Sequence, residues 1–183
     1  MYNGASSYRR YLDGDEDALA EIVKEYFDKL VFFLDRYVNN TAEAEEIALD
    51  VFAQLVADKR RYDFRVSLKT YLFMLGRSRA LDHLRRRKLL FFMDLSEAEQ
   101  IPDPGPTPEE LVLRDARKQA VNRALQQLDP MQRLAIHLVY FEDLSCEEAA
   151  KVLKKTRKQV YNLLYRAKST LRTILGEEGE RIQ

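Results

Sequence analysis

The chain has 183 residues, of which 46% are hydrophobic and 33% are charged, so it can bury one or two cores and remain soluble. Its single cysteine, Cys146, excludes an internal disulfide and fits a reducing compartment, which we expect to be the cytoplasm. The N-terminus is polar without the apolar core of a signal peptide, and no apolar run approaches the ~20 residues of a membrane span. We therefore expect no membrane insertion.

Charge is distributed along the chain in blocks. The 30 Lys and Arg balance the 30 Asp and Glu, which taken alone argues against a nucleic-acid binder. Residues 13–50, however, hold twelve acidic and three basic residues, and residues 77–88 hold six basic and one acidic residue. Residues 94–115 are again acidic, and residues 149–175 contain eight Lys or Arg and no Asp or Glu. This pattern predicts separate basic and acidic surfaces.

The first ninety residues predict an antiparallel domain of three long helices. After a loose N-terminal dozen, apolar residues recur at helical spacing from about Glu16 to Val38. Thr41 is expected to cap a second helix with an acidic first turn, and Ser67 is expected to cap a third that runs to about Leu90. No segment alternates with period two, so we expect no sheet.

The segment 94–107, DLSEAEQIPDPGPT, is acidic and rich in proline, which is typical of a flexible linker. It would separate a domain at 1–93 from a second at 108–183. Thr107 and Pro108 predict the start of a helix that reaches about Leu128, and Asp129 with Pro130 predicts another to about Phe141. The last eight residues, GEEGERIQ, are expected to be a frayed tail.

Residues 144–171 predict a helix-turn-helix. Ser145 with Glu148, and Thr156 with Gln159, have the spacing of capping boxes, so two helix starts lie about a dozen residues apart. The apolar residues of the second helix fall on one side, and the other side is suited to phosphates and base edges in a major groove. A solvated face is the alternative. Two features favour DNA, namely the lack of acidic partners in the basic run and the two tyrosines one turn apart on the polar face. The residues of this side are Arg157, Lys158, Tyr161, Asn162, Tyr165 and Lys168, with Arg166 at its margin.

A second basic segment, GRSRALDHLRRRK, lies in the third predicted helix. The preceding loop, RRYDFRVSLKTYL, interleaves cations with Tyr62, Phe64 and Tyr71. Cations beside aromatic rings can hold a backbone while unpaired bases stack, as in single-strand binders. The alternative, in which the aromatics are core and the arginines only solubilise a helix end, remains open on the residue types alone.

Catalytic chemistry has little support. His83 and His137 each lie on a predicted helix without a second ligand at metal-binding spacing, His83 near the basic surface and His137 in or beside a core. The carboxylates Glu43, Glu45, Glu46 and Asp50 are better explained as a solvated or protein-binding helix face than as a cation site. We therefore expect no enzyme, no cofactor and no metal.

The ordered motifs make a resemblance specific. They are AEAEEIALDVFAQL, SLKTYLFMLGRSRALDHLRRRK, LDPMQRLAIHLVYFEDLSCEEAAKVL and QVYNLLYRAKSTL. From about Ala18 to Leu175 the chain resembles the bacterial extracytoplasmic-function sigma factors, specificity subunits of RNA polymerase. The resemblance implies an all-α fold with a three-helix domain like sigma region 2 and a four-helix helix-turn-helix domain like sigma region 4.

The resemblance also implies roles for individual positions. One face of the second helix would dock on the clamp helices of the largest polymerase subunit, the flap region would be a further contact, and an anti-sigma factor is another candidate partner. The linker would pass near the RNA exit path, and catalysis would belong to the polymerase. The polymerase-binding residues would be Glu46, Leu49, Asp50, Ala53 and Gln54. The −10 residues, which would capture and open the promoter, would be Tyr62, Phe64, Arg65, Lys69, Tyr71, Arg77, Ser78, Arg79, Arg85, Arg86 and Arg87. The −35 residues, which would read duplex, would be Thr156, Arg157, Lys158, Gln159, Tyr161, Asn162, Tyr165, Arg166 and Lys168.

The sequence departs from the usual family pattern at four places. Tyr71 stands where Trp is usual, and Ser78 replaces a common Asn. Lys154 and Lys155 occupy a turn that usually has Gly and an apolar residue, and a lysine adopts a left-handed conformation only at some cost. Leu163 takes a position often held by Arg, so the −35 sequence should differ accordingly.

Two other readings remain at this point. A stand-alone helix-turn-helix regulator explains the C-terminal domain equally well but leaves the basic and aromatic segment of the N-terminal domain without a task. An interaction adaptor would use the charged faces to bind proteins and would never bind DNA.

Overall fold

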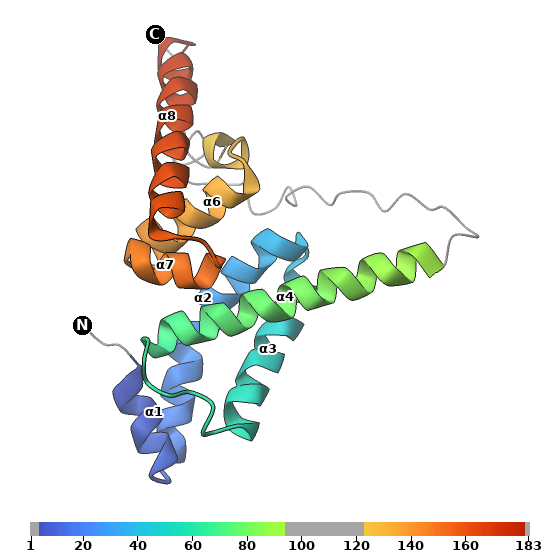
Figure 1. Ribbon diagram of the computed structural model, residues 1–183, viewed down its shortest axis with the longest axis vertical. Helices are drawn as coiled ribbons and strands as arrows, with labels where there is room; N and C mark the ends of the chain where they lie inside the picture. Colours follow the sequence, from blue (N-terminus) through green and yellow to red (C-terminus); the bar gives the residue numbers. More distant parts are fainter. Residues whose placement is uncertain (1–3, 94–122, 182–183) are drawn as a thin grey trace. The chain divides into compact units, whose positions relative to one another are not determined.

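The computed structural model describes residues 4–93 and 123–181. Within those ranges the regular elements are all helices, as the sequence predicts (Figure 1). The chain divides into two compact units, the first built on the helices between Ala5 and Met93 and the second on those between Pro130 and Arg181.

The first unit consists of α1 (Ala5–Leu12), α2 (Glu16–Val38), α3 (Thr41–Ala57) and α4 (Leu68–Met93). Helix α2 packs against each of the other three helices, and α3 also packs against α4. The apolar positions of α2 that recur at helical spacing are buried, among them Ile22, Leu30 and Leu34. The predicted bounds of α2 agree with the observed ones.

The expectation of a loose N-terminal dozen is wrong. Residues 5–12 form α1, and Tyr8 and Tyr11 on this helix are 0% and 5% exposed. A polar helix of eight residues is not stable alone in water, so α1 depends on the core that its tyrosines enter. The first unit therefore has four helices, of which three are the long ones predicted.

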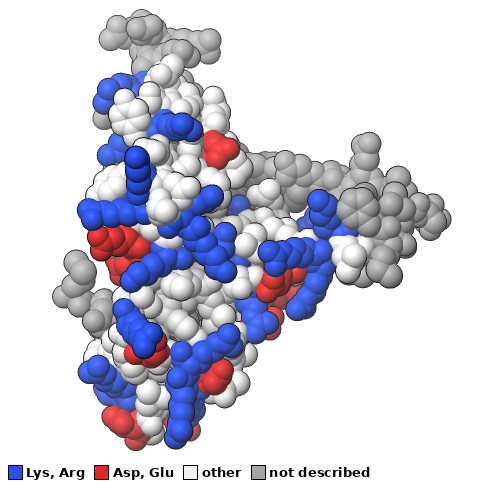
Figure 2. All heavy atoms as spheres, viewed as in Figure 1, with Lys and Arg blue, Asp and Glu red and all other residues white. Residues whose placement is uncertain are grey.

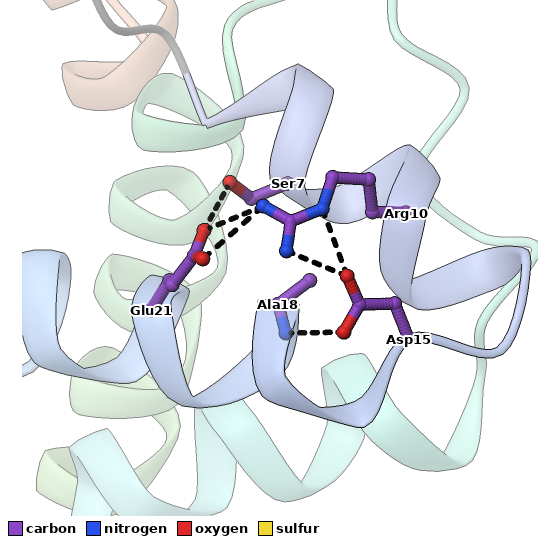
Figure 3. A network of polar contacts seen from close by, with 5 residues as sticks. All are labelled: Ser7, Arg10, Asp15, Ala18 and Glu21. Carbon is purple, nitrogen blue, oxygen red and sulfur yellow. Dashed lines mark hydrogen bonds and ion pairs between the residues drawn. The ribbon is translucent and has the colours of Figure 1, made fainter.

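A network of polar contacts joins α1 to α2 (Figure 3). Arg10 donates to Asp15 at 2.6 Å and to Glu21 at 3.0 Å, and Ser7 also donates to Glu21 at 3.0 Å. Asp15 at the same time caps α2 by accepting from the Ala18 amide at 3.3 Å. The hydrogen bonds from Arg10 lower the pKa of the Asp15 carboxyl below its usual value. Because these ion pairs are exposed, they fix the orientation of α1 more than they stabilise the fold.

The start of α3 differs by one residue from the prediction. The N-cap is Asn40, whose side chain accepts from the Glu43 amide at 3.1 Å, and Thr41 instead donates its hydroxyl to Asp35. Asn39 closes α2 in the left-handed conformation, with φ 50°, which leaves the next residue extended and free to cap. At the start of α4 the predicted cap is confirmed, since Ser67 accepts from the Thr70 amide at 3.1 Å.

Helix α4 lies close against α2 at a glycine. A Cβ placed on Gly76 would come within 2.9 Å of Cδ1 of Leu30 and 3.3 Å of Cδ2 of Leu34. Phe73 and Ala80, one turn before and after, are both 0% exposed. Beyond this contact α4 continues past α2 and α3 (Figure 1), and its side chains from residue 85 to 89 are exposed.

The second unit consists of α6 (Pro130–Ile136), the π-helix η2 (His137–Phe141), α7 (Cys146–Leu153) and α8 (Arg157–Arg181). Asp129 caps α6 by accepting from the Met131 amide at 2.9 Å, and Pro130 follows it as predicted. Helix α6 packs against α8. The predicted frayed tail is wrong as far as Arg181, because α8 reaches that residue.

Two predictions fall outside the described residues. The linker at 94–107 lies there entirely, and so does most of the helix expected between Thr107 and Leu128. Residues 123–126, at the end of that helix, are helical, and Ala124 and Leu128 are buried.

Candidate nucleic-acid and polymerase interfaces

Both capping boxes of the helix-turn-helix are present. The Glu148 carboxylate accepts from the Ser145 amide and hydroxyl at 3.0 and 2.8 Å, and the Ser145 hydroxyl accepts from the Glu148 amide at 3.2 Å. At the second box, the Gln159 side chain accepts from the Thr156 amide at 2.8 Å, and the Gln159 amide donates to the Thr156 hydroxyl at 3.2 Å. These paired bonds fix where α7 and α8 begin.

The turn between α7 and α8 has the strained geometry expected from its lysines. Lys154 is left-handed, with φ 51°, and the Lys155 amide donates to the Ala150 carbonyl at 2.9 Å. A residue with a Cβ adopts this conformation at a cost, which the hydrogen bonds at the end of α7 offset.

Helix α8 has one buried and one exposed face. Val160, Leu164 and Ala167 are buried, with 0%, 6% and 0% of their surface exposed. Tyr165 is 77% exposed and Tyr161 is 48% exposed, although rings of this size normally find cover. The predicted −35 residues are all exposed; they are Thr156, Arg157, Lys158, Gln159, Tyr161, Asn162, Tyr165, Arg166 and Lys168.

Arg157 is held in place by two neighbours. It forms an ion pair with Glu147 of α7 at 2.9 Å and donates to the Tyr161 hydroxyl at 3.3 Å. Its guanidinium also lies 5.4 Å from the centroid of the Tyr161 ring. The hydrogen bond to Tyr161 is the main reason that the pKa of Arg157 is raised. Residues 149–175 thus contain no acidic residue, but Glu147 of α7 pairs with Arg157. Tyr161 also contacts Arg157, which the sequence did not indicate.

The first turn of α8 is electrostatically unusual. It begins with Arg157 and Lys158 and contains no acidic residue, whereas the first turn of α7 contains Glu147 and Glu148. A helix N-terminus carries about half a positive charge, so a cation there without an acidic partner costs about 0.3–1 kcal/mol at the surface. The same place favours an anion, because the helix dipole and both cations attract it.

The second basic surface lies on α4. Lys and Arg side chains gather toward the end of α4 and along α8 (Figure 2). Ser78, Arg85, Arg86 and Arg87 are exposed, and Arg77 and Arg79 are half-buried. Two of them have acidic neighbours, since Arg87 lies 3.5 Å from Glu43 and Arg85 lies 3.2 Å from Asp82.

His83 lies at this basic surface, as expected, with its Nε2 2.8 Å from Glu43. Arg77 lies beside Tyr37. Burial raises the pKa of Tyr37 to about 12, and the charge of Arg77 opposes this rise. The part of the basic surface nearest the core is therefore fixed by contacts to α2 and α3.

The loop between α3 and α4, residues 58–67, brings the predicted aromatic residues together. The Tyr62 ring lies 4.6 Å from the Phe64 ring and 5.1 Å from the Tyr71 ring, centroid to centroid. Tyr62 is only 3% exposed and donates its hydroxyl to the Val66 carbonyl at 2.7 Å. Burial raises its pKa to about 12. Tyr62 thus fits the core alternative, whereas Phe64 and Tyr71 are partly exposed. Of the two loop-flanking cations in the predicted set, Arg65 is exposed and Lys69 is half-buried.

The predicted polymerase face lies on α3. Glu46, Leu49, Asp50 and Ala53 are exposed, and Leu49 shows 59% of its surface. Gln54 is half-buried, because its side chain accepts two hydrogen bonds from Arg79 of α4, at 2.7 and 3.2 Å. The structure therefore brings four of the five residues to one exposed face and joins the fifth to the basic surface.

The described residues contain no group of three or more His, Cys, Asp or Glu side chains that could hold a metal ion. His137, 2% exposed, lies in a core as expected, with its Nε2 3.6 Å from Glu142. Of the helices that the structure describes, none combines the length and apolar character needed to cross a bilayer.

Comparison with known proteins decides the family. The profile of Sigma-70 region 2 matches residues 22–89, and that of Sigma-70 region 4 matches residues 118–171. The sigma factor RpoE of Cereibacter sphaeroides is 30% identical over 137 residues, which cover 74% of each chain. The chain belongs to the extracytoplasmic-function RNA polymerase sigma factors. Such a subunit directs RNA polymerase to promoters for transcription initiation, and this is the function of the chain.

Other sigma factors agree with this assignment. SigW of Bacillus subtilis is 27% identical over 172 residues, covering 90% of this chain and 92% of its own. Among solved structures, RpoE of Bartonella quintana in complex with the anti-sigma factor NepR superposes with a TM-score of 0.67 at 20% identity, over 86% of this chain and 96% of that one. CnrH in complex with the cytosolic domain of CnrY gives a TM-score of 0.61 at 19% identity, over 96% of both chains. These two superpositions show the shared fold.

Several residues of this sigma factor that touch the predicted sites were missed by the sequence reasoning. Arg9 of α1 places its guanidinium 5.0 Å from the Phe64 ring centroid, and the Tyr140 ring centroid lies 4.9 Å from the ammonium of Lys168, a residue of the predicted −35 set. Tyr8 hydrogen-bonds to the backbone of the aromatic loop. No local pattern marks these pairs, because their members are distant in the sequence.

Proposed function

We propose that the second unit of this sigma factor reads the −35 promoter element with the exposed face of α8. The first turn of α8 is the observation that carries the proposal. Lys158 forms no ion pair with the described residues and stands where the helix dipole disfavours a cation, whereas Arg157 beside it is paired with Glu147. A DNA phosphate at this helix N-terminus would make the position of Lys158 favourable. Tyr161 and Tyr165 are exposed one and two turns further along the same face, a position suited to contact with base edges.

We propose that the first unit binds the polymerase and captures the opened −10 strand. Leu49, an exposed apolar side chain between Glu46 and Asp50, has the character of an interface centre, and α3 would dock it on the clamp helices of the largest subunit. The partly exposed rings of Phe64 and Tyr71, flanked by Arg65 and the cations of α4, suit an unpaired strand.

The remaining assignments follow from this division of labour. Residues 1–93 and 108–183 would act as separate domains joined by the linker at 94–107. The polymerase would supply all catalysis, so the sigma factor would need no catalytic residue, and it would act in the cytoplasm. The flap region and an anti-sigma factor are further proposed partners; RpoE of Bartonella quintana is found with the anti-sigma factor NepR.

In vitro transcription tests these roles. Core polymerase is given a pool of promoters with the wild-type protein, with Leu49→Glu or with Lys158→Ala. We expect specific transcripts with the wild type, loss of polymerase binding for Leu49→Glu, and, for Lys158→Ala, retained polymerase binding with weaker, more salt-sensitive use of all −35-dependent promoters. If Leu49→Glu binds the polymerase as the wild type does, and Lys158→Ala keeps wild-type transcription from −35-dependent promoters, the proposed assignments are wrong.

A further inference from the structure

Helix α1 is joined to the aromatic loop by a buried tyrosine. Tyr8 is 0% exposed, and its hydroxyl donates to the Lys59 carbonyl at 2.9 Å, with the Leu55 carbonyl 3.4 Å away. Leu55 belongs to the last turn of α3, where carbonyls lack partners within the helix, and Lys59 lies in the loop that follows. The Tyr8 hydroxyl of α1 thus binds backbone carbonyls at the end of α3 and in the loop that follows it.

The ring of Tyr8 also forms the base of the aromatic cluster. It packs edge-on against Tyr62, with centroids 5.4 Å apart and planes at 74°, and lies 6.0 Å from Phe64. Tyr62 in turn contacts Phe64 and Tyr71. Buried rings in this arrangement pack with defined geometry, so the position of Tyr8 is transmitted to the partly exposed rings.

The loop needs such support because Phe64 is strained. Its φ is 62°, in the left-handed region that a residue with a bulky side chain rarely adopts. A residue remains in this conformation only where its surroundings hold it there, and such residues are frequent at binding sites. Here α1 contributes much of the surroundings, since Arg9 covers the Phe64 ring at 5.0 Å and Tyr11 lies under the Lys59 ammonium at 4.4 Å.

Helix α1 is itself fixed in place. Arg10 ties it to Asp15 and Glu21 of the α2 end (Figure 3). At its start, Gly4 has φ 68° and lies so close to α2 that a Cβ would come within 2.8 Å of the Tyr26 hydroxyl. A helix fixed at both ends can serve as a rigid reference for the loop.

We infer that α1 holds the −10 capture loop in its binding conformation, and that Tyr8 is the positioning residue through which it does so. This inference rests on the proposed capture of the −10 strand by Phe64 and Tyr71. Tyr8 itself is buried and touches no DNA. Its role is to keep Phe64 in the left-handed conformation and so to set the position of the rings that meet the unpaired base.

The test uses Tyr8→Phe, which removes the hydroxyl and keeps the ring. The matched control is Tyr11→Phe, which keeps the ring that contacts Lys59 and removes only a hydroxyl for which the described residues provide no hydrogen bond to the loop. Amide hydrogen exchange on the free protein is the first measurement. We expect faster exchange of residues 59–67 in Tyr8→Phe than in the wild type, with exchange in α2 unchanged, which also shows that the variant is folded.

Transcription with core polymerase is the second measurement. Discrimination between a promoter and its single-base −10 variants should fall about three- to tenfold for Tyr8→Phe, the equivalent of one buried hydrogen bond. Discrimination at the −35 element and affinity for core polymerase should stay at the wild-type level. A loss of stability alone would reduce transcription from all promoters equally and would leave −10 discrimination intact.

The outcomes separate the inference from the proposal on which it rests. If wild-type protein discriminates at −10 but Tyr8→Phe matches Tyr11→Phe in exchange and in discrimination, the inference is overturned and the proposed function stands. If the wild type shows −10 discrimination that survives replacement of Phe64 and Tyr71 by alanine, the proposed capture site is wrong, and the inference fails with it even if the exchange result is as expected.

Discussion

Replacing Lys158 by alanine should make this sigma factor more stable and less able to bind its promoter. Lys158 is the second residue of α8, is exposed, and forms no ion pair with the described residues. Removing a cation from the first turn of a helix gains about 0.3–1 kcal/mol, because the N-terminal end of the helix dipole is positive. A gain of 1 kcal/mol in a unit of this size raises the Tm by about 4–8 °C.

The effect on DNA has the opposite sign. If Lys158 neutralises one phosphate, its loss reduces the slope of log K against log salt by about 0.9, and the affinity falls most at low salt. The sequence preference at −35 should not change, because a phosphate contact carries no base information. Thermal unfolding of the free protein gives the first quantity. Titration of holoenzyme with promoter DNA at several salt concentrations gives the second.

Arg172→Ala is the control for both measurements. Arg172 is an exposed arginine of the same helix, outside its first turn and outside the predicted contact set. We expect it to change neither the Tm nor the salt slope appreciably. The reasoning is refuted if Lys158→Ala lowers the stability, or if its salt slope equals that of Arg172→Ala.

Three further predictions concern other parts of the molecule. Tyr165→Ala should change the free energy of unfolding by less than about 0.5 kcal/mol, since the side chain is 77% exposed. It should nevertheless reduce transcription from −35-dependent promoters about fivefold or more. Transcription equal to that of the wild type would remove Tyr165 from the contact set. Leu49→Glu should weaken core polymerase binding about tenfold or more in a pull-down titration. Leu12→Glu, at a leucine that is 39% exposed on α1, should not weaken it. A similar loss for both variants would show that α3 is not the polymerase-binding face. Burial raises the pKa of Tyr8 and Tyr62 from 10.0 to about 12. The folded state therefore keeps protons that the unfolded state releases, and the free energy of unfolding should fall as the pH rises from 10 to 12. Denaturant titrations that show a constant free energy of unfolding over this range would contradict these shifts.

The elements that depend on local chemistry were predicted well. Ser67, Ser145 and Thr156 cap their helices as their spacing indicated, because a capping bond needs only residues within one turn. The bounds of α2 were predicted because its apolar residues recur over six turns. Thr41 was the wrong cap for a similarly local reason, since Asn40 next to it is an equally good cap and the left-handed Asn39 decides between them.

The features that the sequence did not reveal depend on contacts between distant residues. Tyr8 donates its hydroxyl to the carbonyl of Lys59, which is 51 residues away in the chain. No motif next to either residue indicates this contact. For the same reason α1, short and polar, looked like a loose terminus. Gln54 was predicted to face the polymerase, but Arg79, 25 residues later, accounts for its orientation. In the candidate sites, the exposed faces of α3 and α8 follow from helical periodicity. The burial of Tyr62, by contrast, could be recognised only from the folded structure.

The close approach of α4 to α2 has a consequence for how promoter preference can diverge. The attachment of α4 rests on Phe73, Gly76 and Ala80, which all face the core. Ser78 between them is exposed, and so are the side chains of residues 85–89 further along the helix. If α4 contacts the −10 strand as proposed, mutations at these outward positions can alter the bases that are preferred without requiring compensating changes in the core. Folding and promoter choice on this helix can therefore evolve nearly independently, so duplicated copies of such a gene can acquire new target promoters without first losing a stable fold.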